Sequence, residues 1–272
     1  MNIGILGAGG RMGRMLVAEV TNTEGAALAG GTEVPGNPMI GMDTGALAGV
    51  GDNNITITDD AAALFRLSDV VIDFTLPAAT IGNATLARET GTALVIGTTG
   101  LSDEQQAAIE TAATKTAVVQ APNFSMGVNL LFALTQRVAA ILDEDFDIEI
   151  LEMHHRHKVD APSGTALGLG QAAAAGRAIN LAEKSQRVRD GHTGPRDTGS
   201  IGFATLRGGD VVGEHTVMFA GPSERVELTH KAASREIFAR GAVRAALWTA
   251  GKPPGLYSML DVLGLSPTTA QR

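Results

Sequence analysis

Short apolar runs alternate with helical patterns along the first half of the chain. The runs span 2–6, 26–31, 70–74, 93–97 and 117–121, and turn residues or helical patterns bound each of them. Helical spacing covers 11–21, 78–90 and 102–114, and the last of these opens with the capping-box pair Ser102 and Gln105. Strands that are short and apolar throughout are buried on both faces, so the pattern predicts an α/β fold with a doubly wound parallel sheet.

The pattern changes after about residue 125. Alternating apolar and polar positions predict further strands, in "FDIEILEMHH" and at 201–207, 212–220 and 224–231. Helical spacing predicts helices at 128–142, 164–178 and 234–249. The Gly-Gly-Asp turn at 208–210 lies between two alternating runs and predicts an antiparallel hairpin. These elements predict a second, α+β domain with a mixed sheet of its own.

Composition narrows the possible partners and location. The 272 residues carry a formal net charge of −8 at pH 7, which disfavours binding to nucleic acid or to an anionic membrane. The chain has no Cys, so disulfides and thiolate chemistry are excluded. No apolar run reaches the about 18–20 residues of a membrane helix, and no secretory signal pattern is present. We therefore expect a cytoplasmic protein.

A glycine turn follows the first predicted strand. Gly7, Gly10 and Gly13 open the first helix, where free N–H groups and close backbone approach favour a pyrophosphate. Glu33 ends the second strand about 20 residues further on, where an acid can bind the adenosine ribose. The alternative is a tight turn without a ligand. A dinucleotide site is favoured, and its predicted residues are Gly7, Ala8, Gly9, Gly10, Arg11, Met12 and Glu33.

Val34 bears on the choice of dinucleotide. An Arg at this position can hold the 2′-phosphate of NADP, whereas Val34 cannot and Glu33 would repel that phosphate. The sequence therefore predicts that NADH is preferred over NADPH.

Two further loops leave the carboxyl ends of predicted strands. "GTTG" begins at Gly97 and "APNFS" begins at Ala121. Ligands of open α/β sheets bind at these strand ends, so both loops are expected beside the nicotinamide and its ribose. The residues predicted there are Gly97, Thr98, Thr99, Ala121, Pro122, Asn123 and Phe124.

The stretch "EMHHRHKVDAPSGTA" holds half of the six histidines. His154, His155 and His157 stand there with Lys158 beside them. A metal site is disfavoured, because adjacent histidines on a strand point to opposite sides and no zinc-binding helix spacing occurs. A solvated polar loop is a second interpretation.

The residues directly after the histidines favour an anion site with proton transfer. A helix is predicted to begin at about Ser163, which would leave the N–H groups of Ser163, Gly164 and Thr165 free for a carboxylate. His155 and Lys158 are candidates for holding a second carboxylate, and His titrates near neutral pH. The cluster predicts a small dicarboxylate substrate that receives a proton here.

At these residues the chain resembles the dihydrodipicolinate reductases, also called 4-hydroxy-tetrahydrodipicolinate reductases, of bacterial lysine and diaminopimelate biosynthesis. "GAGGRMG", "GTTG", "APNFSMGVN", "EMHHRHKVDAPSGTA" and "GEHTVMFAGPSERVELTHKAASR" match the family pattern in order and span nearly the whole chain. The resemblance implies that His154 is a proton donor or acceptor and that Lys158 is a proton donor. It also implies that His155, Gly164 and Thr165 bind the substrate.

The resemblance also implies the reaction and the assembly. The expected enzyme reduces (2S,4S)-4-hydroxy-2,3,4,5-tetrahydrodipicolinate to tetrahydrodipicolinate, with loss of water and oxidation of NADH or NADPH. We expect a Rossmann-type dinucleotide domain at 1–125, completed by 236–272, and a substrate-binding and tetramerisation domain at 126–235. The implied assembly is a homotetramer built through the sheets of the second domain. Val34 departs from members that carry Arg there.

Two other functions remain open at this point. One is another NAD(P)-dependent dehydrogenase with two domains, although an acylating semialdehyde dehydrogenase would need the nucleophilic Cys that this chain lacks. The other is a catalytically silent dinucleotide sensor, against which His154, Lys158 and the Ser-Gly-Thr turn occur together.

Overall fold

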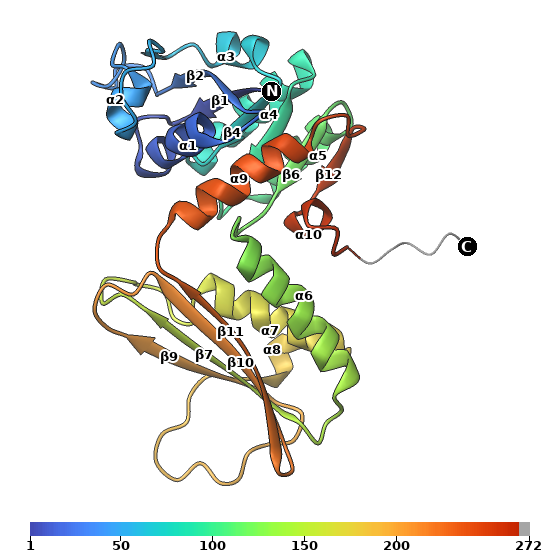
Figure 1. The fold of residues 1–272 in the computed structure, drawn as a ribbon. Helices are drawn as coiled ribbons and strands as arrows, with labels where there is room; N and C mark the ends of the chain where they lie inside the picture. The colour runs from blue at the N-terminus through green and yellow to red at the C-terminus, as the bar shows by residue number, and fades with distance from the viewer. Residues whose placement is uncertain (267–272) are drawn as a thin grey trace. The chain divides into compact units, whose positions relative to one another are not determined.

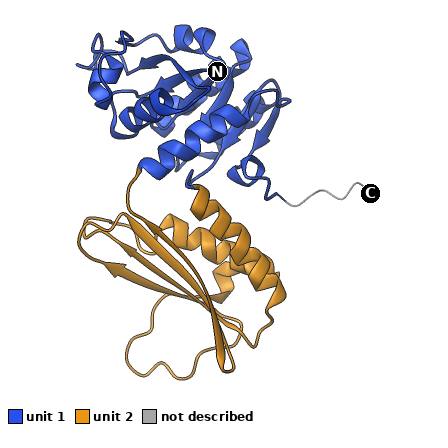
Figure 2. Cartoon of the chain, in the orientation of Figure 1, with its two compact units in different colours: residues 1–125, 236–272 blue, residues 126–235 orange. Residues whose placement is uncertain are grey.

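The chain divides into two compact units in a computed structural model that describes residues 1–266. Unit 1 comprises Met1–Ser125 and the chain from Glu236 onward, and unit 2 comprises Met126–Arg235 (Figure 2). Each unit has its own sheet, so each is described by itself.

Unit 1 is built on a parallel sheet, which has seven strands within the described residues, in the order β12-β6-β5-β4-β1-β2-β3 (Figure 1). The strands are β1 (Asn2–Leu6), β2 (Ala27–Thr32), β3 (Ile57–Thr58), β4 (Val70–Asp73), β5 (Ala93–Ile96), β6 (Ala117–Gln120) and β12 (Gly255–Tyr257). The predicted doubly wound sheet is confirmed.

Helices cover both faces of this sheet. Val71 and Leu94 share a buried cluster with residues of α3 (Ala61–Leu67), α4 (Thr80–Thr90) and α5 (Asp103–Ala113). Their neighbours Ile72 and Val95 are equally buried, and they face the opposite side because side chains alternate along a strand. Helices α1 (Arg11–Asn22) and α9 (Glu236–Trp248) cover that side of the sheet and pack against each other. The short elements α2 (Thr44–Ala48), η1 (Pro77–Ala79), β3, β12 and α10 (Met259–Val262) were not predicted.

Unit 2 holds a mixed sheet of five strands in residues 126–235, in the order β11-β10-β7-β9-β8. They are β7 (Asp147–His154), β8 (Ser185–Gln186), β9 (Ile201–Arg207), β10 (Gly213–Gly221) and β11 (Glu224–Ala232). The predicted hairpin of 201–220 is wrong, because β7 lies between β9 and β10. Alternation marks a strand but not its partner, and the antiparallel hairpin is instead β10–β11.

Two helices cover one face of this mixed sheet. Apolar residues of α6 (Met126–Ile141) and α7 (Gly164–Arg177) pack on Ile148 and Ile150, which are inward positions of β7. Glu152 occupies the next inward position and has a relative exposure of 1%. The short α8 (Leu181–Lys184) follows α7. A carboxylate therefore continues the apolar row of β7 toward the end of the strand.

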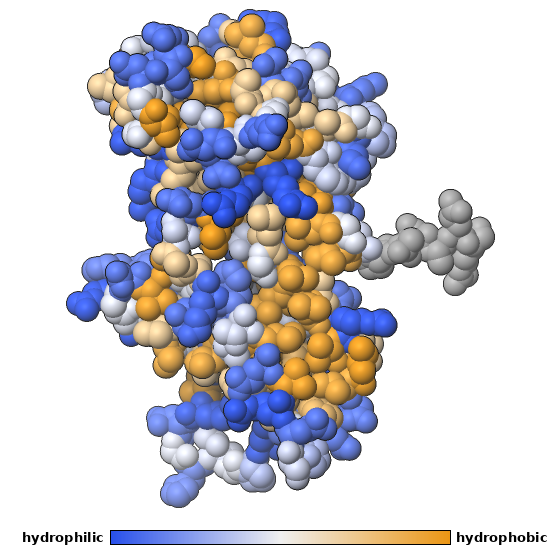
Figure 3. All heavy atoms as spheres, viewed as in Figure 1, coloured by the Kyte–Doolittle hydropathy of each residue, from blue (hydrophilic) through white to orange (hydrophobic). Residues whose placement is uncertain are grey.

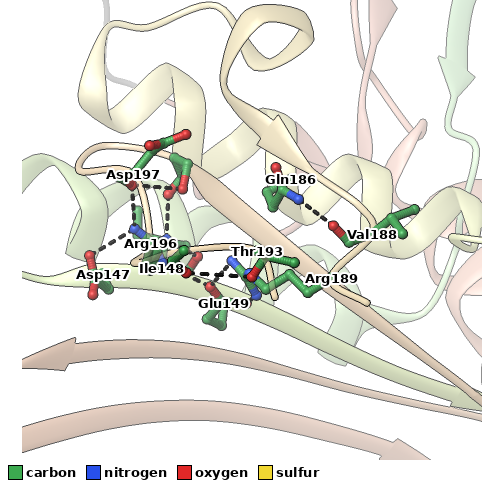
Figure 4. Close-up of polar contacts among 11 residues, drawn as sticks. Asp147, Ile148, Glu149, Gln186, Val188, Arg189, Thr193, Arg196 and Asp197 are labelled. Carbon is green, nitrogen blue, oxygen red and sulfur yellow. Dashed lines mark hydrogen bonds and ion pairs between the residues drawn. The ribbon is translucent and has the colours of Figure 1, made fainter. Parts of the chain in front are cut away.

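The opposite face of the mixed sheet carries a long loop, residues 187–200, which is fixed by two arginines (Figure 4). Arg189 donates to both carboxylate oxygens of Glu149, at 2.8 and 2.7 Å. Arg196 donates to Glu149, to Asp147 and to backbone carbonyls of 148, 197 and 200. These bonds hold a glycine-containing loop against β7.

Apolar side chains also gather on the outer surface of α6, as Figure 3 shows for that part of unit 2. Leu130, Leu134 and Ile141 are 44%, 41% and 66% exposed. They lie on the side of α6 that α7 and the sheet leave uncovered.

Candidate active site

The glycine turn of unit 1 forms the tight strand-to-helix connection that the sequence predicts. Gly7 has φ of +67°, which a side chain would strain. A Cβ at Gly13 would lie 2.0 Å from the Gly7 carbonyl oxygen, so only glycine allows α1 to pack this closely on the turn. The N-cap residue Gly10 makes no capping bond with a side chain. The first turn of α1 thus keeps its N–H groups and the positive end of its dipole for a ligand.

Glu33 lies beside this turn, as expected. Its Oε1 accepts the N–H of Gly9 at 3.0 Å, and its Oε2 accepts Nδ2 of Asn37 at 3.0 Å. Both oxygens are held in place without a cation, so the carboxylate is preoriented. Val34, the next residue, is 68% exposed and presents an apolar side chain there.

The two loops that were predicted to lie beside a nicotinamide meet at the carboxyl edge of the sheet. Ala121 donates its N–H to the carbonyl of Ile96 at 3.2 Å, and the rings of Phe74 and Phe124 lie 5.3 Å apart. A Cβ at Gly97 would lie 2.4 Å from the ring of Phe74, so this glycine is required by packing. Thr99 and Pro122 are exposed and Asn123 is partly buried, whereas Thr98 is buried.

Asp73, at the end of β4, organises these loops and was not singled out in the sequence. It is 1% exposed and accepts the N–H and hydroxyl of Thr75 at 2.9 and 2.6 Å. It also accepts Nδ2 of Asn83 at 2.7 Å and the hydroxyl of Thr98 at 3.4 Å. The hydroxyl of Thr98 is therefore occupied by a hydrogen bond to Asp73, so only the backbone of Thr98 is available to a ligand.

In unit 2 the end of β7 places His154 against a buried carboxylate. His154 Nδ1 lies 2.6 Å from Glu152 Oε2. Arg207, the last residue of β9, pairs in register with His154 and donates to both oxygens of Glu152 at 2.8 and 2.9 Å. The N–H of Ser163 donates to Glu152 Oε1 at 3.0 Å. This last bond corrects one expectation: the N–H of Ser163 is not free for a substrate, because Glu152 uses it.

Burial and pairing set the protonation of this cluster in opposite directions. Burial alone would raise the pKa of Glu152, but hydrogen bonds from Arg207, His154 and Ser163 outweigh it and lower that pKa. Burial lowers the pKa of His154, although contact with Glu152 opposes the shift. An ionised carboxylate thus faces a largely neutral imidazole at pH 7.

His215 extends the cluster across the sheet. It pairs in register with Glu152 and is 4% exposed. Its Nε2 lies 3.0 Å from Ser163 Oγ, which also accepts the N–H of Ala166 and so caps α7. Its ring packs edge-on against His154 at 5.1 Å. Burial, and then the neighbouring His154, lower the pKa of His215 to about 4, so this ring is neutral at pH 7.

Lys158 and the start of α7 adjoin the same strand end. Lys158 Nζ donates to Asp160 Oδ1 at 2.7 Å, and its charge is among the causes that lower the pKa of His154. His155 has a buried Nδ1 without a hydrogen-bond partner in the described part of the chain. Gly164 is the first residue of α7, and a Cβ there would meet only open space. Thr165 follows it in the first helical turn.

The predicted residues of unit 2 therefore lie at one end of β7, while the sequence analysis missed part of their support. Glu152, Arg207, His215 and Asp160 were given no role. A signal for Glu152 existed, because it stands at an inward position of the alternating run after Ile148 and Ile150. Arg207 had no local signal, since it reaches Glu152 only through the parallel pairing of β9 with β7.

Two features of the described residues bear on other functions. Within residues 1–266 no group of His, Cys, Asp or Glu side chains is arranged to hold a metal ion. None of the helices in that range is both long and apolar enough to cross a bilayer.

Comparison with known proteins identifies one family over the full length of the described fold. Sequence models match the dihydrodipicolinate reductase N-terminus at residues 1–124 and the dihydrodipicolinate reductase C-terminus at residues 127–263. A 4-hydroxy-tetrahydrodipicolinate reductase of Afipia carboxidovorans is 60% identical over 97% of each chain. That of Chelativorans sp. is 58% identical over 100% of this chain and 98% of its own.

A solved structure agrees with these matches. Dihydrodipicolinate reductase from Paenisporosarcina sp. TG-14, described as dipicolinate-bound, is 25% identical and has a TM-score of 0.76. The similarity covers 96% of this chain and 98% of that one. An amine dehydrogenase from Mycobacterium smegmatis, 13% identical with a TM-score of 0.60, shares the fold alone.

Proposed function

The chain belongs to the dihydrodipicolinate reductase family, and we propose that it reduces (2S,4S)-4-hydroxy-2,3,4,5-tetrahydrodipicolinate with a reduced nicotinamide cofactor in bacterial lysine and diaminopimelate biosynthesis. One water is lost, one hydride and one proton are added, and the product is tetrahydrodipicolinate. It is an oxidoreductase, as its relatives are named.

The observation that supports this function best is the strand end of β7. There His154 and Lys158 lie beside the first turn of α7, whose residue Gly164 has open space next to it. The N-terminus of a helix favours a carboxylate, and the unpartnered Nδ1 of His155 offers a second hydrogen-bonding group. The related structure described as dipicolinate-bound makes a planar dicarboxylate a reasonable ligand for this place.

The cofactor fits the residues of unit 1. The uncapped first turn of α1 suits a pyrophosphate, and the carboxylate of Glu33 suits the hydroxyls of the adenosine ribose. When bound, the reduced nicotinamide supplies the hydride. Residues Gly7–Met12, Glu33, Gly97–Thr99 and Ala121–Phe124 are our proposed binding residues.

Residues of unit 2 are proposed to supply the proton and to orient the substrate. His154 Nε2 is the proposed proton donor and acceptor, and the ammonium of Lys158 is the proposed second donor. Gly164, Thr165 and His155 are proposed to hold the substrate carboxylates. Holding a dianion in one orientation beside a proton donor removes much of the entropic barrier to the reaction.

NADH is the proposed preferred cofactor. Glu33 is held by Gly9 and Asn37 rather than by a cation, so its charge remains to repel a 2′-phosphate. The exposed Val34 provides no group that binds such a phosphate.

A coupled assay tests the function and the cofactor together. The substrate is generated in situ from pyruvate and aspartate semialdehyde by its synthase, and oxidation of NADH and of NADPH is followed separately. We expect oxidation that depends on the coupled substrate, with a kcat/KM for NADH about tenfold or more above that for NADPH, since one unfavourable phosphate contact costs about 1.4 kcal/mol or more. Absence of oxidation with either cofactor, in a folded chain that binds NADH, would contradict the proposed reaction.

We further propose a homotetramer that acts in the cytoplasm. The face of the mixed sheet opposite α6 and α7 carries partly exposed Leu151, Met153 and Met218 and the more exposed Leu206. Apolar side chains that stay partly exposed on this face, beside the loop 187–200, favour packing against a second copy. Light scattering of the purified chain measures the assembly directly, and a monomeric mass would contradict it.

A further inference from the structure

We propose that Glu152 is a positioning residue for proton transfer: it accepts the Nδ1–H of His154 and fixes the tautomer of that ring. The lone pair of Nε2 then takes up a proton from solvent, and the imidazolium gives that proton to the substrate and returns to the neutral ring with hydrogen on Nδ1. The inference rests on the proposed function, in which His154 donates and accepts that proton. It concerns a residue that never needs to touch the substrate.

The hydrogen-bond pattern around Glu152 determines which nitrogen of His154 carries hydrogen. Arg207 and the N–H of Ser163 can only donate, and they bind both oxygens of a carboxylate that is 1% exposed. Such a carboxylate is ionised and can only accept. The 2.6 Å contact with His154 therefore requires hydrogen on Nδ1, which leaves Nε2 with the lone pair in the neutral ring.

No side chain of Gly213 crowds the opposite edge of the ring. A Cβ at Gly213 would lie 3.0 Å from His154 Nε2, so glycine on β10 leaves room at that nitrogen. His215 packs edge-on against the ring, and its own Nε2 is engaged by Ser163 Oγ. The ionisable groups that act on this ring come from three strands and one loop: Glu152 from β7, Arg207 from β9, His215 from β10 and Lys158 from the loop after β7.

The same carboxylate also fixes the start of α7. Its Oε1 accepts the N–H of Ser163, and Ser163 caps that helix through its hydroxyl. One buried group thus sets both the ring that exchanges the proton and the helix end proposed to hold a substrate carboxylate. A shift of Glu152 would change their relative positions, to which proton transfer is sensitive.

Glu152→Gln tests the proposal. To keep accepting from Arg207 and Ser163 with its single oxygen, the amide turns its NH₂ toward His154, which forces hydrogen onto Nε2. We expect kcat to fall about 10²-fold while KM for the dicarboxylate changes less than about threefold. The double variant Glu152→Gln/His154→Gln should turn over as fast as His154→Gln alone, within about twofold, because both changes remove one function.

Glu149→Gln is the matched control. Glu149 lies on the same strand, is also paired with arginine, in its case Arg189 and Arg196, and faces the other side of the sheet. Its kcat should stay within about twofold of the wild type. A kcat within about threefold of the wild type in Glu152→Gln, or equal losses in both variants, would overturn the proposal.

Long-range ¹H–¹⁵N NMR of the imidazoles gives a readout without substrate, with His154 assigned by its loss in His154→Gln. We expect hydrogen on Nδ1 of His154 in the wild type and on Nε2 in Glu152→Gln. Hydrogen on Nε2 in the wild type would overturn the positioning role. Because this measurement needs no turnover, it separates failure of the positioning role from failure of the proposed reaction, which the coupled assay detects.

Discussion

A buried carboxylate lies near the carboxyl end of a strand in each unit, Asp73 on β4 and Glu152 on β7, and each is 1% exposed. Their partners differ in kind. Asp73 accepts from hydroxyls, an amide and a backbone N–H, all neutral. Glu152 accepts from a guanidinium and an imidazole as well as a backbone N–H.

The difference separates two uses of buried charge. Hydroxyls rotate and an amide can exchange its donor and acceptor ends, so the bonds around Asp73 can rearrange while the loops keep their shape. A guanidinium can only donate, and an imidazole changes charge near pH 7. Asp73 therefore fixes a loop that we propose binds the cofactor, whereas Glu152 influences the protonation of the imidazole beside it.

The largest expected effect comes from replacing each carboxylate by its amide. In Glu152→Gln the guanidinium of Arg207 faces an NH₂ group, and we expect the free energy of unfolding to fall by about 3–5 kcal/mol. In Asp73→Asn the amide of Asn83 can turn to present its oxygen, so the loss should be only about 1 kcal/mol. Urea unfolding followed by circular dichroism measures both.

Arg207→Lys is the control for this pair, because it keeps a positive charge but loses the bidentate geometry. It should fall between the wild type and Glu152→Gln in stability. Equal losses in Asp73→Asn and Glu152→Gln would show that the kind of donor is unimportant and would end the comparison.

The pH dependence of stability gives the next largest effect. The pKa of His215 falls from 6.5 to about 4 on folding, because burial and then His154 disfavour its charge. Below pH 6.5, His215 of the unfolded chain therefore binds a proton that His215 of the folded chain does not bind. The free energy of unfolding decreases as the pH is lowered from 6.5 to about 4. Between pH 7 and pH 5 this residue should account for about 2 kcal/mol.

His215→Gln isolates that contribution. When the pH is lowered from 7 to 5, the free energy of unfolding of the variant should fall by about 2 kcal/mol less than that of the wild type. This difference does not depend on the absolute stability of the variant. His154 and His230 also have lowered pKa values through burial and leave a residual slope of the same sign. His192→Gln, in an exposed loop, should keep the wild-type slope. An unchanged slope in His215→Gln would remove His215 from the titrating cluster.

Sequence reasoning predicted most of unit 1 because its signals are local. Each strand is a short apolar run, and the glycine turn indicates the strand-to-helix connection within a few residues. The same reasoning failed for β9 and β10, where partner choice depends on β7, about 50 residues earlier in the chain. Short edge elements such as β3 and β12 hold too few residues to show a period.

The residues of the proposed catalytic site also fall into two groups, those with a local sequence signal and those without one. His154 and Lys158 were predicted because they occur together in one stretch before a helix start. Their supports come from three other strands or loops, Arg207 on β9, His215 on β10 and Asp160 beyond Lys158. Of these, Arg207 and His215 come together with Glu152 only through sheet register, which a sequence pattern does not contain.

The smallest expected effect concerns cofactor binding and tests whether Asp73 fixes only a loop. Asp73→Asn keeps the size of the side chain but weakens the bond to the hydroxyl of Thr98, which is already long at 3.4 Å. We expect the KM for NADH to rise about three- to tenfold, equivalent to about 1 kcal/mol, with kcat unchanged within about twofold. Thr98→Val, which removes the same bond from the other side, should give a similar KM, and the two changes together should not add. A fall in kcat as large as that of Glu152→Gln would mean that Asp73 also acts on the proton-transfer step, and the two carboxylates would then not differ in the way their partners suggest.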